Sequence, residues 1–100
     1  MEISVTDFAQ IQDNAFILDV REGWELKKAT LKKVVHCPLS ALTGAIESFP
    51  QGQTIYVLCH HGVRSLKAAL YLQNQGLNAI SIRGGIDAYA RDVDASVGFY

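Results

Sequence analysis

The segment between an apolar run and a predicted helix carries the residues best suited to chemistry. It spans residues 59–65, Cys-His-His-Gly-Val-Arg-Ser, directly after the β-branched and aromatic run Thr54–Leu58. At such a junction, loop amides and the helix N-terminus point toward one small space, which forms an anion site. Amide dipoles and a nearby Arg favour the thiolate form of a sulfur held there. The sequence therefore predicts Cys59 as a nucleophile.

The remainder of this segment is the predicted substrate-binding loop. Arg64 falls in the first turn of the helix, where a cation opposes the helix dipole and needs a compensating anion. The Cys59 thiolate or a bound anion would supply that charge, whereas a solvated Arg64 is the alternative. The loop consists of His60, His61, Gly62, Val63, Arg64 and Ser65.

Several neighbouring polar residues have two readings. Ser65 could donate a hydrogen bond to the sulfur or only cap the helix. His60 and His61 could tune the loop charge and relay protons, or simply hold its shape. Three adjacent residues cannot present zinc ligands at the usual spacing, so no metal site is predicted from Cys59 and the two histidines.

Cys37, before Pro38, is predicted as a core residue, with a resolving thiol as the alternative.

Asp19 and Arg21 are predicted to support the site. Asp19 ends a buried strand, where an unpaired carboxylate is costly, so we expect it to anchor loop amides or an Arg. Arg21 either faces the pocket and attracts anions or forms a surface ion pair with Glu22 or Glu25. Trp24 and Tyr89 are expected to be core aromatics. The basic residues Lys27, Lys28, Lys32 and Lys33 indicate a solvated face that could dock an acidic partner.

Short apolar strands alternate with helices along the chain. Continuous apolar strands separated by helices predict an α/β fold with a parallel sheet covered on both faces. Ligands in such sheets bind at the carboxyl ends of the strands, where Asp19 and Cys59 both fall. The predicted strands are Ile3–Val5, Ala15–Val20, Val34–Cys37, Thr54–Leu58 and Asn78–Ile82. The predicted helices begin at Thr6 or Asp7, Glu22, Ser40, Arg64 and Ile86 and end near Ile11, Ala29, Phe49, Gln75 and Val93.

Composition narrows the class of protein. One hundred residues with 49% apolar and 19% charged residues are typical of one globular domain, predicted over residues 1–100. The net charge of −1 argues against nucleic acid as a partner. No apolar run reaches membrane-spanning length, and the first residues lack a secretory pattern. Two cysteines make a disulfide framework improbable, so we expect a working thiol in the reducing cytoplasm.

Three motifs in register resemble the single-domain rhodanese-like sulfurtransferases. They are residues 18–22 (Leu-Asp-Val-Arg-Glu), the cysteine loop, and residues 84–89 (Gly-Gly-Ile-Asp-Ala-Tyr), and the tail from Val93 to Tyr100 is also similar. The chain departs from the family at residues 29–34, where a Gly-His-Ile-Pro-Gly-Ala segment is usual, and at Tyr89, where Trp is common. The resemblance implies a five-stranded parallel sheet and a cysteine that carries sulfane sulfur as a persulfide.

The implied reaction moves sulfur from a donor such as thiosulfate to cyanide, a cellular thiol or a sulfur-carrier protein, without a cofactor or metal. One alternative is a cysteine-dependent phosphatase or arsenate reductase on the same scaffold. Arg64 stands five positions after Cys59, one fewer than in phosphatase cradles, and the shorter loop favours a single sulfur atom. The other alternative is a non-enzymatic sulfur-carrier or redox-sensing module.

Overall fold

Five parallel strands form one sheet at the centre of the molecule. The computed structural model describes residues 1–100, and every neighbouring strand pair in it is parallel. The strands lie in the order β1-β5-β4-β2-β3. This confirms the predicted five-stranded parallel α/β fold. The strands are β1 (Glu2–Ile3), β2 (Phe16–Asp19), β3 (Val34–His36), β4 (Ile55–Leu58) and β5 (Ala79–Ile82).

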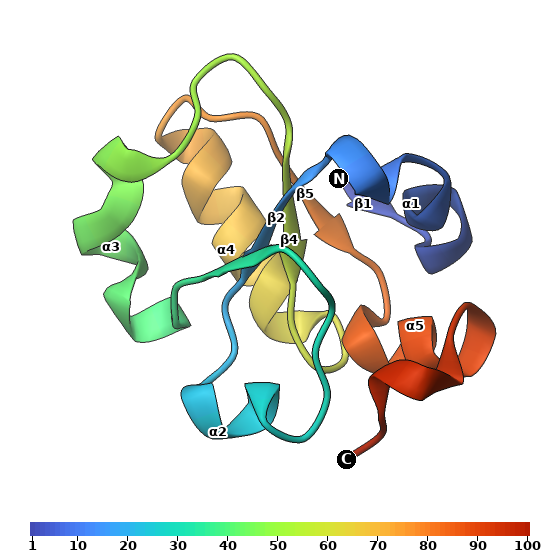
Figure 1. Ribbon diagram of the computed structural model, residues 1–100. Helices are drawn as coiled ribbons and strands as arrows, with labels where there is room; N and C mark the ends of the chain where they lie inside the picture. Colours follow the sequence, from blue (N-terminus) through green and yellow to red (C-terminus); the bar gives the residue numbers. More distant parts are fainter.

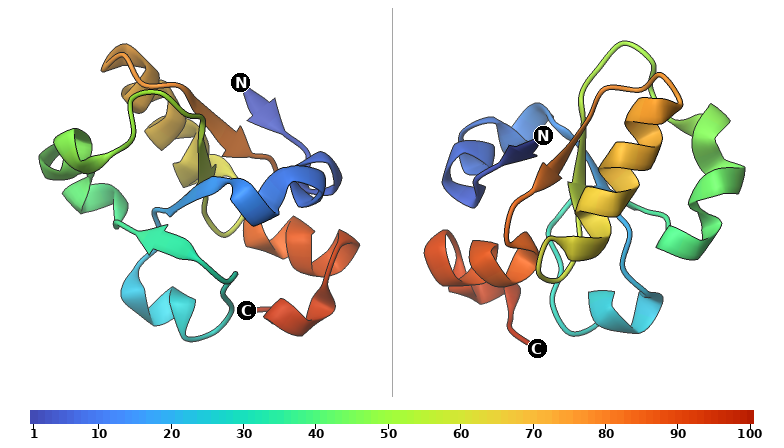
Figure 2. Two further views of the ribbon diagram at one scale, coloured as in Figure 1. Left: turned by 45° about the horizontal axis from the view of Figure 1, so that its top comes forward. Right: turned by 180° about the vertical axis from the view of Figure 1, so that it is seen from behind.

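Helices cover both faces of this sheet (Figures 1 and 2). Helices α3 and α4 lie on one face, and α1 and α5 lie on the other. The α-helices are α1 (Val5–Ile11), α2 (Gly23–Leu26), α3 (Leu42–Ala45), α4 (Val63–Asn74) and α5 (Gly85–Asp92), and 3-10 turns cover Gln12–Asn14, Leu39–Ala41, Ile46–Ser48 and Ala95–Val97. No helix has the length and apolarity needed to cross a bilayer.

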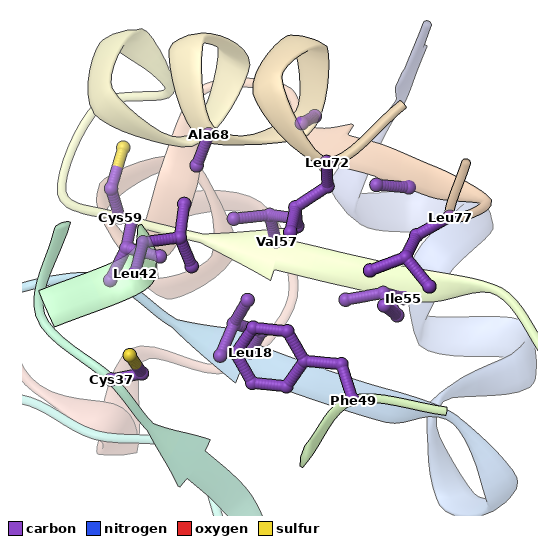
Figure 3. Packing of buried hydrophobic residues seen from close by; sticks show 13 residues of the cluster. Leu18, Cys37, Leu42, Phe49, Ile55, Val57, Cys59, Ala68, Leu72 and Leu77 are labelled. Atoms are coloured by element: carbon purple, nitrogen blue, oxygen red, sulfur yellow. The ribbon is translucent and has the colours of Figure 1, made fainter. Parts of the chain in front are cut away.

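Each strand supplies side chains to two separate cores, because successive residues point to opposite faces. In β4, Val57 packs under α4 with Ala68 and Leu72 (Figure 3). The next residue, Leu58, packs in the other core with Phe8. Burial on both faces explains why the central strands contain almost no polar residues.

The N-terminal strand is shorter than predicted. We predicted a strand over Ile3–Val5 and a helix cap at Thr6 or Asp7. The strand ends at Ile3, and the Ser4 hydroxyl accepts a hydrogen bond from the Asp7 amide at 3.1 Å. Ser4 is therefore the N-cap of α1, which begins one residue later.

Two predicted helices are also shorter or broken. The helix expected over Glu22–Ala29 is limited to Gly23–Leu26, and the amides of Lys28 and Ala29 both turn back to the Glu25 carbonyl. The helix expected from Ser40 to Phe49 is divided among two 3-10 turns and the four-residue α3. Gly44 lies inside α3, and so short a helix has little stability of its own.

Strand register sets the position of the cysteine loop. Asp19 of β2 is paired with Leu58 of β4, and the Val20 amide donates to the Leu58 carbonyl at 3.0 Å. Cys59 therefore leaves the sheet beside Val20, at the edge where the strands have their carboxyl ends. The loop then turns directly into α4.

Candidate active site

Gly62 makes the sharp turn between Cys59 and α4. Its φ of 95° lies in the left-handed region, which favours glycine. A Cβ on Gly62 would also lie 2.8 Å from the amide nitrogen of Gly84. Both constraints require glycine here, and they bring the N-terminus of α4 close to the cysteine.

The sulfur of Cys59 is surrounded by hydrogen-bond donors. The amides of Gly62 and Ser65 donate to Sγ at 3.0 and 3.3 Å, and Ser65 Oγ lies 3.3 Å from it. Ser65 Oγ also lies 2.7 Å from Ser81 Oγ, which fixes the hydroxyl position. Cys59 is only 1% exposed. These donors are arranged to stabilise negative charge on sulfur, and Gly62, not Ser65, is the helix cap.

Helix α5 holds the opposite side of the loop. The Ile86 and Asp87 amides donate to the carbonyls of Cys59 and His60 at 2.9 and 3.1 Å. The amides of His60 and His61 share those trans peptide planes, so they point away from α5. A Cβ on Gly85 would lie 2.4 Å from both loop carbonyls. The glycine pair before α5 therefore sets how closely this helix approaches the cysteine loop.

Arg64 pairs with a carboxylate instead of the cysteine. Its two terminal nitrogens donate to the two carboxylate oxygens of Glu25 at 2.6 and 2.7 Å. The Arg64 side chain is 34% exposed, whereas the Glu25 side chain is 4% exposed. The anion that compensates Arg64 is thus Glu25 and not the Cys59 thiolate. The alternative prediction, an Arg64 side chain solvated without a partner, is wrong as well.

The buried Glu25 carboxylate accepts hydrogen bonds from two further groups besides Arg64. The Glu22 amide donates to Oε2 at 2.8 Å, and the Tyr100 hydroxyl donates to Oε1 at 2.9 Å. The hydrogen bonds from Arg64 are the main cause of a Glu25 pKa lowered to about 2, although burial opposes the shift. They also raise the pKa of Arg64. The site therefore contains a neutralised ion pair.

Asp19 and Arg21 form a second, fully buried ion pair, which the Tyr100 hydroxyl joins to Glu25 of the first. Arg21 donates to Asp19 through Nη2 at 2.8 Å and through Nε at 3.0 Å. It also donates to the Ala29 carbonyl and to the Tyr100 hydroxyl, each at 2.9 Å. Asp19 anchors an Arg as predicted. Arg21 was predicted either to face the pocket or to form a surface ion pair with Glu22 or Glu25, and both predictions are wrong. Arg21 is 0% exposed and attracts no anion at the surface.

Three aromatic rings stack beside the loop. His60 lies between His61 and Tyr100, with ring centroids 3.8 Å away on each side. Trp24 meets the Tyr100 ring edge-on at 6.2 Å and is 60% exposed, so the prediction of Trp24 as a core residue is wrong. Tyr89 is buried as predicted.

The other predicted candidates lie away from the sulfur of Cys59. Cys37 is a free, buried thiol in the core under α4, and burial raises its pKa. Figure 3 shows its side chain apart from that of Cys59, beyond β2. His36 binds the Arg21 carbonyl at 2.7 Å. Lys27, Lys28, Lys32 and Lys33 are exposed, as a solvated face requires.

The two basic residues Lys32 and Lys33 also line the largest surface cavity, of about 420 Å³, together with Asp13 and Asp94. Cys59 lines none of the surface cavities. The buried sulfur is therefore reached at the loop itself and not through a preformed hollow.

Sequence reasoning missed four contributors to the site: Glu25 as the partner of Arg64, Ser81, Gly85 and Tyr100. The three-residue spacing of Glu22 and Glu25 is a capping-box pattern that could have drawn attention to Glu25. Nothing local marks Ser81 or Tyr100, because each reaches the site only through the fold.

Comparison with known proteins agrees with this geometry. The sequence model of the rhodanese-like domain matches residues 4–92. The chain belongs to the rhodanese-like family. The match includes the cysteine loop, the Asp19–Arg21 pair and the whole of α5, whereas Tyr100 lies beyond it.

Relatives of this rhodanese-like chain include a protein named as a sulfurtransferase and one named as a putative sulfur carrier. It is 28% identical over 92 residues to the thiosulfate sulfurtransferase GlpE of Vibrio cholerae, covering 91% of this chain and 87% of that protein. It is 38% identical over 82 residues to the putative sulfur carrier protein YrkF of Bacillus subtilis, covering 79% of this chain and 44% of that protein. A rhodanese-related protein from Thermoplasma volcanium superposes with a TM-score of 0.88 at 28% identity, with 92% of each chain covered.

Proposed function

We propose that this rhodanese-like domain transfers sulfane sulfur through a persulfide on Cys59. The Cys59 thiolate attacks the outer sulfur of thiosulfate, the S–S bond of the donor breaks, and sulfite leaves with the electron pair. A nucleophile such as cyanide or a thiolate then attacks the terminal sulfur of the persulfide. The persulfide bond breaks, sulfur leaves on the acceptor, and the Cys59 thiolate is regenerated.

The observation that carries this proposal is the convergence of the Gly62 and Ser65 amides on Cys59 Sγ, at 3.0 and 3.3 Å. Negative charge is present on sulfur before attack and returns there when the acceptor takes the terminal sulfur. Fixed amide dipoles stabilise that charge without having to reorganise. The donor set needs no metal or cofactor for this exchange.

The size of the loop favours sulfur over phosphate. Two amides contact one atom, Cys59 Sγ, and Arg64 has both terminal nitrogens engaged by Glu25. A phosphatase needs its Arg free to hold two oxyanion oxygens of a tetrahedral group. We therefore place thiosulfate, and not a phosphate ester or arsenate, as the class of substrate.

The acceptor we propose is a thiol, either small or on a sulfur-carrier protein. The similarity to a putative sulfur carrier supports that class. The exposed Lys27 and Lys28, close in sequence to Glu25, offer a basic surface to an acidic carrier. A persulfide that is handed to thiols suits a reducing compartment, so we place the protein in the cytoplasm.

Activity assays of two cysteine variants test the proposal. Cys59→Ser should abolish thiosulfate-to-cyanide transfer, because it removes the nucleophile and changes little else. Cys37→Ser is the matched control and should keep most of the activity. If a folded Cys37→Ser protein lost turnover, a two-cysteine exchange would replace the single-cysteine mechanism.

A further inference from the structure

Two loop histidines and one helix carboxylate come together beside the cysteine. The nearest ligand atoms of His60, His61 and Asp87 all lie within 4.8 Å of one another. Asp87 is brought there by its own backbone, because its amide donates to the His60 carbonyl at 3.1 Å. The cluster is thus fixed by the same contact that joins α5 to the loop.

His60 has an unsatisfied polar atom. Its Nε2 is buried and has no hydrogen-bond partner, the only such side-chain atom in the protein. A buried polar group without a partner is destabilising, because it has lost its hydrogen bonds to water. The ring is held by its stack on Tyr100, with the ring centroids 3.8 Å apart, and this restricts its turning toward another partner. A bound ligand would recover that cost.

Asp87 is the charged ligand of this cluster, and its present partner holds it only weakly. The Asp87 carboxylate pairs with exposed Arg91 at 3.2 Å, and a surface pair of this kind is weak enough to yield.

We propose that His60, His61 and Asp87 bind a divalent zinc ion. Two imidazoles and one carboxylate match the ligand preferences of Zn²⁺ and disfavour Mg²⁺ or Ca²⁺, which take oxygen ligands. Tetrahedral zinc with bonds of about 2.0–2.1 Å needs ligand atoms roughly 3.3 Å apart. The ligand atoms lie within 4.8 Å of one another, so zinc binding requires the exposed His61 ring to leave its stack on His60 and the half-buried Asp87 side chain to rotate.

This site was not predicted from the sequence, which gave no zinc site for Cys59 and the adjacent histidines. The missing ligand comes from α5, more than twenty residues away in the chain. A zinc ion bound there would link the cysteine loop to α5 through His60, the residue next to Cys59. The site therefore gives zinc a means of restraining the loop that holds the sulfur.

Metal binding to the Cys59→Ser protein tests the site separately from sulfur transfer. The substitution removes the thiolate, which would bind zinc itself. Titration with Zn²⁺ at neutral pH should show one ion per chain. His61→Asn and Asp87→Asn, each in this background, should weaken binding at least about tenfold, since even the loss of an outer partner of a metal ligand costs ~10–100-fold.

Asp92→Asn is the matched control, because Asp92 also lies on α5 and beside Arg91 but not in the cluster. It should bind zinc like its parent. Imidazole resonances of His60 and His61 should shift on titration, whereas those of His36, which binds the Arg21 carbonyl, should not. The proposal is overturned if the Cys59→Ser protein binds no zinc, or if His61→Asn and Asp87→Asn bind it as tightly as Asp92→Asn.

Discussion

Arg64 and Glu25 form a two-pronged ion pair at the rim of the cysteine loop, with N–O distances of 2.6 and 2.7 Å. The two residues are 39 positions apart, and the pair joins α2 to the first turn of α4. Its effect on the sulfur is indirect. Glu25 cancels the charge of Arg64, and Arg64 in turn prevents a buried carboxylate from repelling an anionic donor.

Arg64→Ala should therefore slow both sulfur transfer and the alkylation of Cys59 by iodoacetamide at neutral pH. The reason is that Glu25 is left as an uncompensated negative charge near the thiolate. The double variant Glu25→Gln/Arg64→Ala removes both charges and should recover a large part of the alkylation rate. A double variant as slow as Arg64→Ala would mean that Arg64 contacts the donor directly.

Acid should destabilise the protein over a pH range set by Glu25. The pKa of this carboxylate falls from its ordinary 4.5 to about 2 on folding. A lowered pKa in the folded state means that Glu25 stabilises the protein above pH 4.5, and that this contribution is lost as the pH falls toward 2.

The size of this contribution is about 2 kcal/mol, from about 1.4 kcal/mol per pKa unit reduced for the solvent that screens Arg64. Chemical denaturation of the native protein and Glu25→Gln at pH 7 and pH 3 measures it. The difference in unfolding free energy between the two proteins should be smaller at pH 3 than at pH 7. An equal difference at both pH values contradicts the role given to this carboxylate.

Gly85 should be required for an ordered cysteine loop. In Gly85→Ala the new Cβ meets the carbonyls of Cys59 and His60 at 2.4 Å, so α5 or the loop must move. Loss of most sulfur transfer and a fall in stability should follow. Gly76→Ala is the matched control, because Gly76 also has a positive φ, of 86°, but nothing lies within 4 Å of its Cβ position.

Gly76→Ala should lose about 1 kcal/mol from backbone strain while its transfer activity stays near that of the parent. Circular dichroism and thiosulfate-to-cyanide assays of both variants separate the two effects. Equal activity in Gly85→Ala and Gly76→Ala would show that the contact of α5 with the loop does not position Cys59.

Loop length should set the class of substrate. Inserting one residue between Gly62 and Val63 gives the Cys-to-Arg spacing of phosphatase cradles and separates the amides that now meet at Sγ. Sulfur transfer should fall sharply, because the donors no longer converge on one atom. Weak binding of phosphate or arsenate should appear in exchange.

Aryl phosphate hydrolysis and sulfur transfer are measured for both proteins, with folding checked by circular dichroism. A native protein that hydrolyses the phosphate ester faster than it transfers sulfur would place the reaction in the phosphatase class.

The central sheet could be predicted because its strands are buried on both faces. Ile17 and Leu18 enter different cores, so their segment reads as a continuous apolar run. Helix α4 was predicted to within one residue at each end, because Gly62 and Gly76 mark its two ends with positive φ values. Short elements were less predictable. Ser4 caps α1 although it was predicted as part of a strand. A strand of two residues is too short for its sequence pattern to show where it ends.

Within the site, local sequence revealed Cys59 and its loop but not the partners of the loop. Glu25 points inward because Arg64 and Tyr100 bind it, and both lie far along the chain. Trp24 was expected in the core on its apolar character alone, yet it lies at the surface against Tyr100. Asp87 was recognised only as part of a motif, because its closeness to His60 and His61 depends on how α5 packs.

The mass of the intact protein after treatment with thiosulfate, measured without reductant, tests the persulfide on Cys59 most directly. We predict a gain of one sulfur atom that peptide mapping locates on Cys59 and that cyanide removes. Cys37→Ser should gain the same mass, and Cys59→Ser should gain none. A native protein that stays at its original mass, or a folded Cys59→Ser protein that still gains sulfur, would contradict the mechanism.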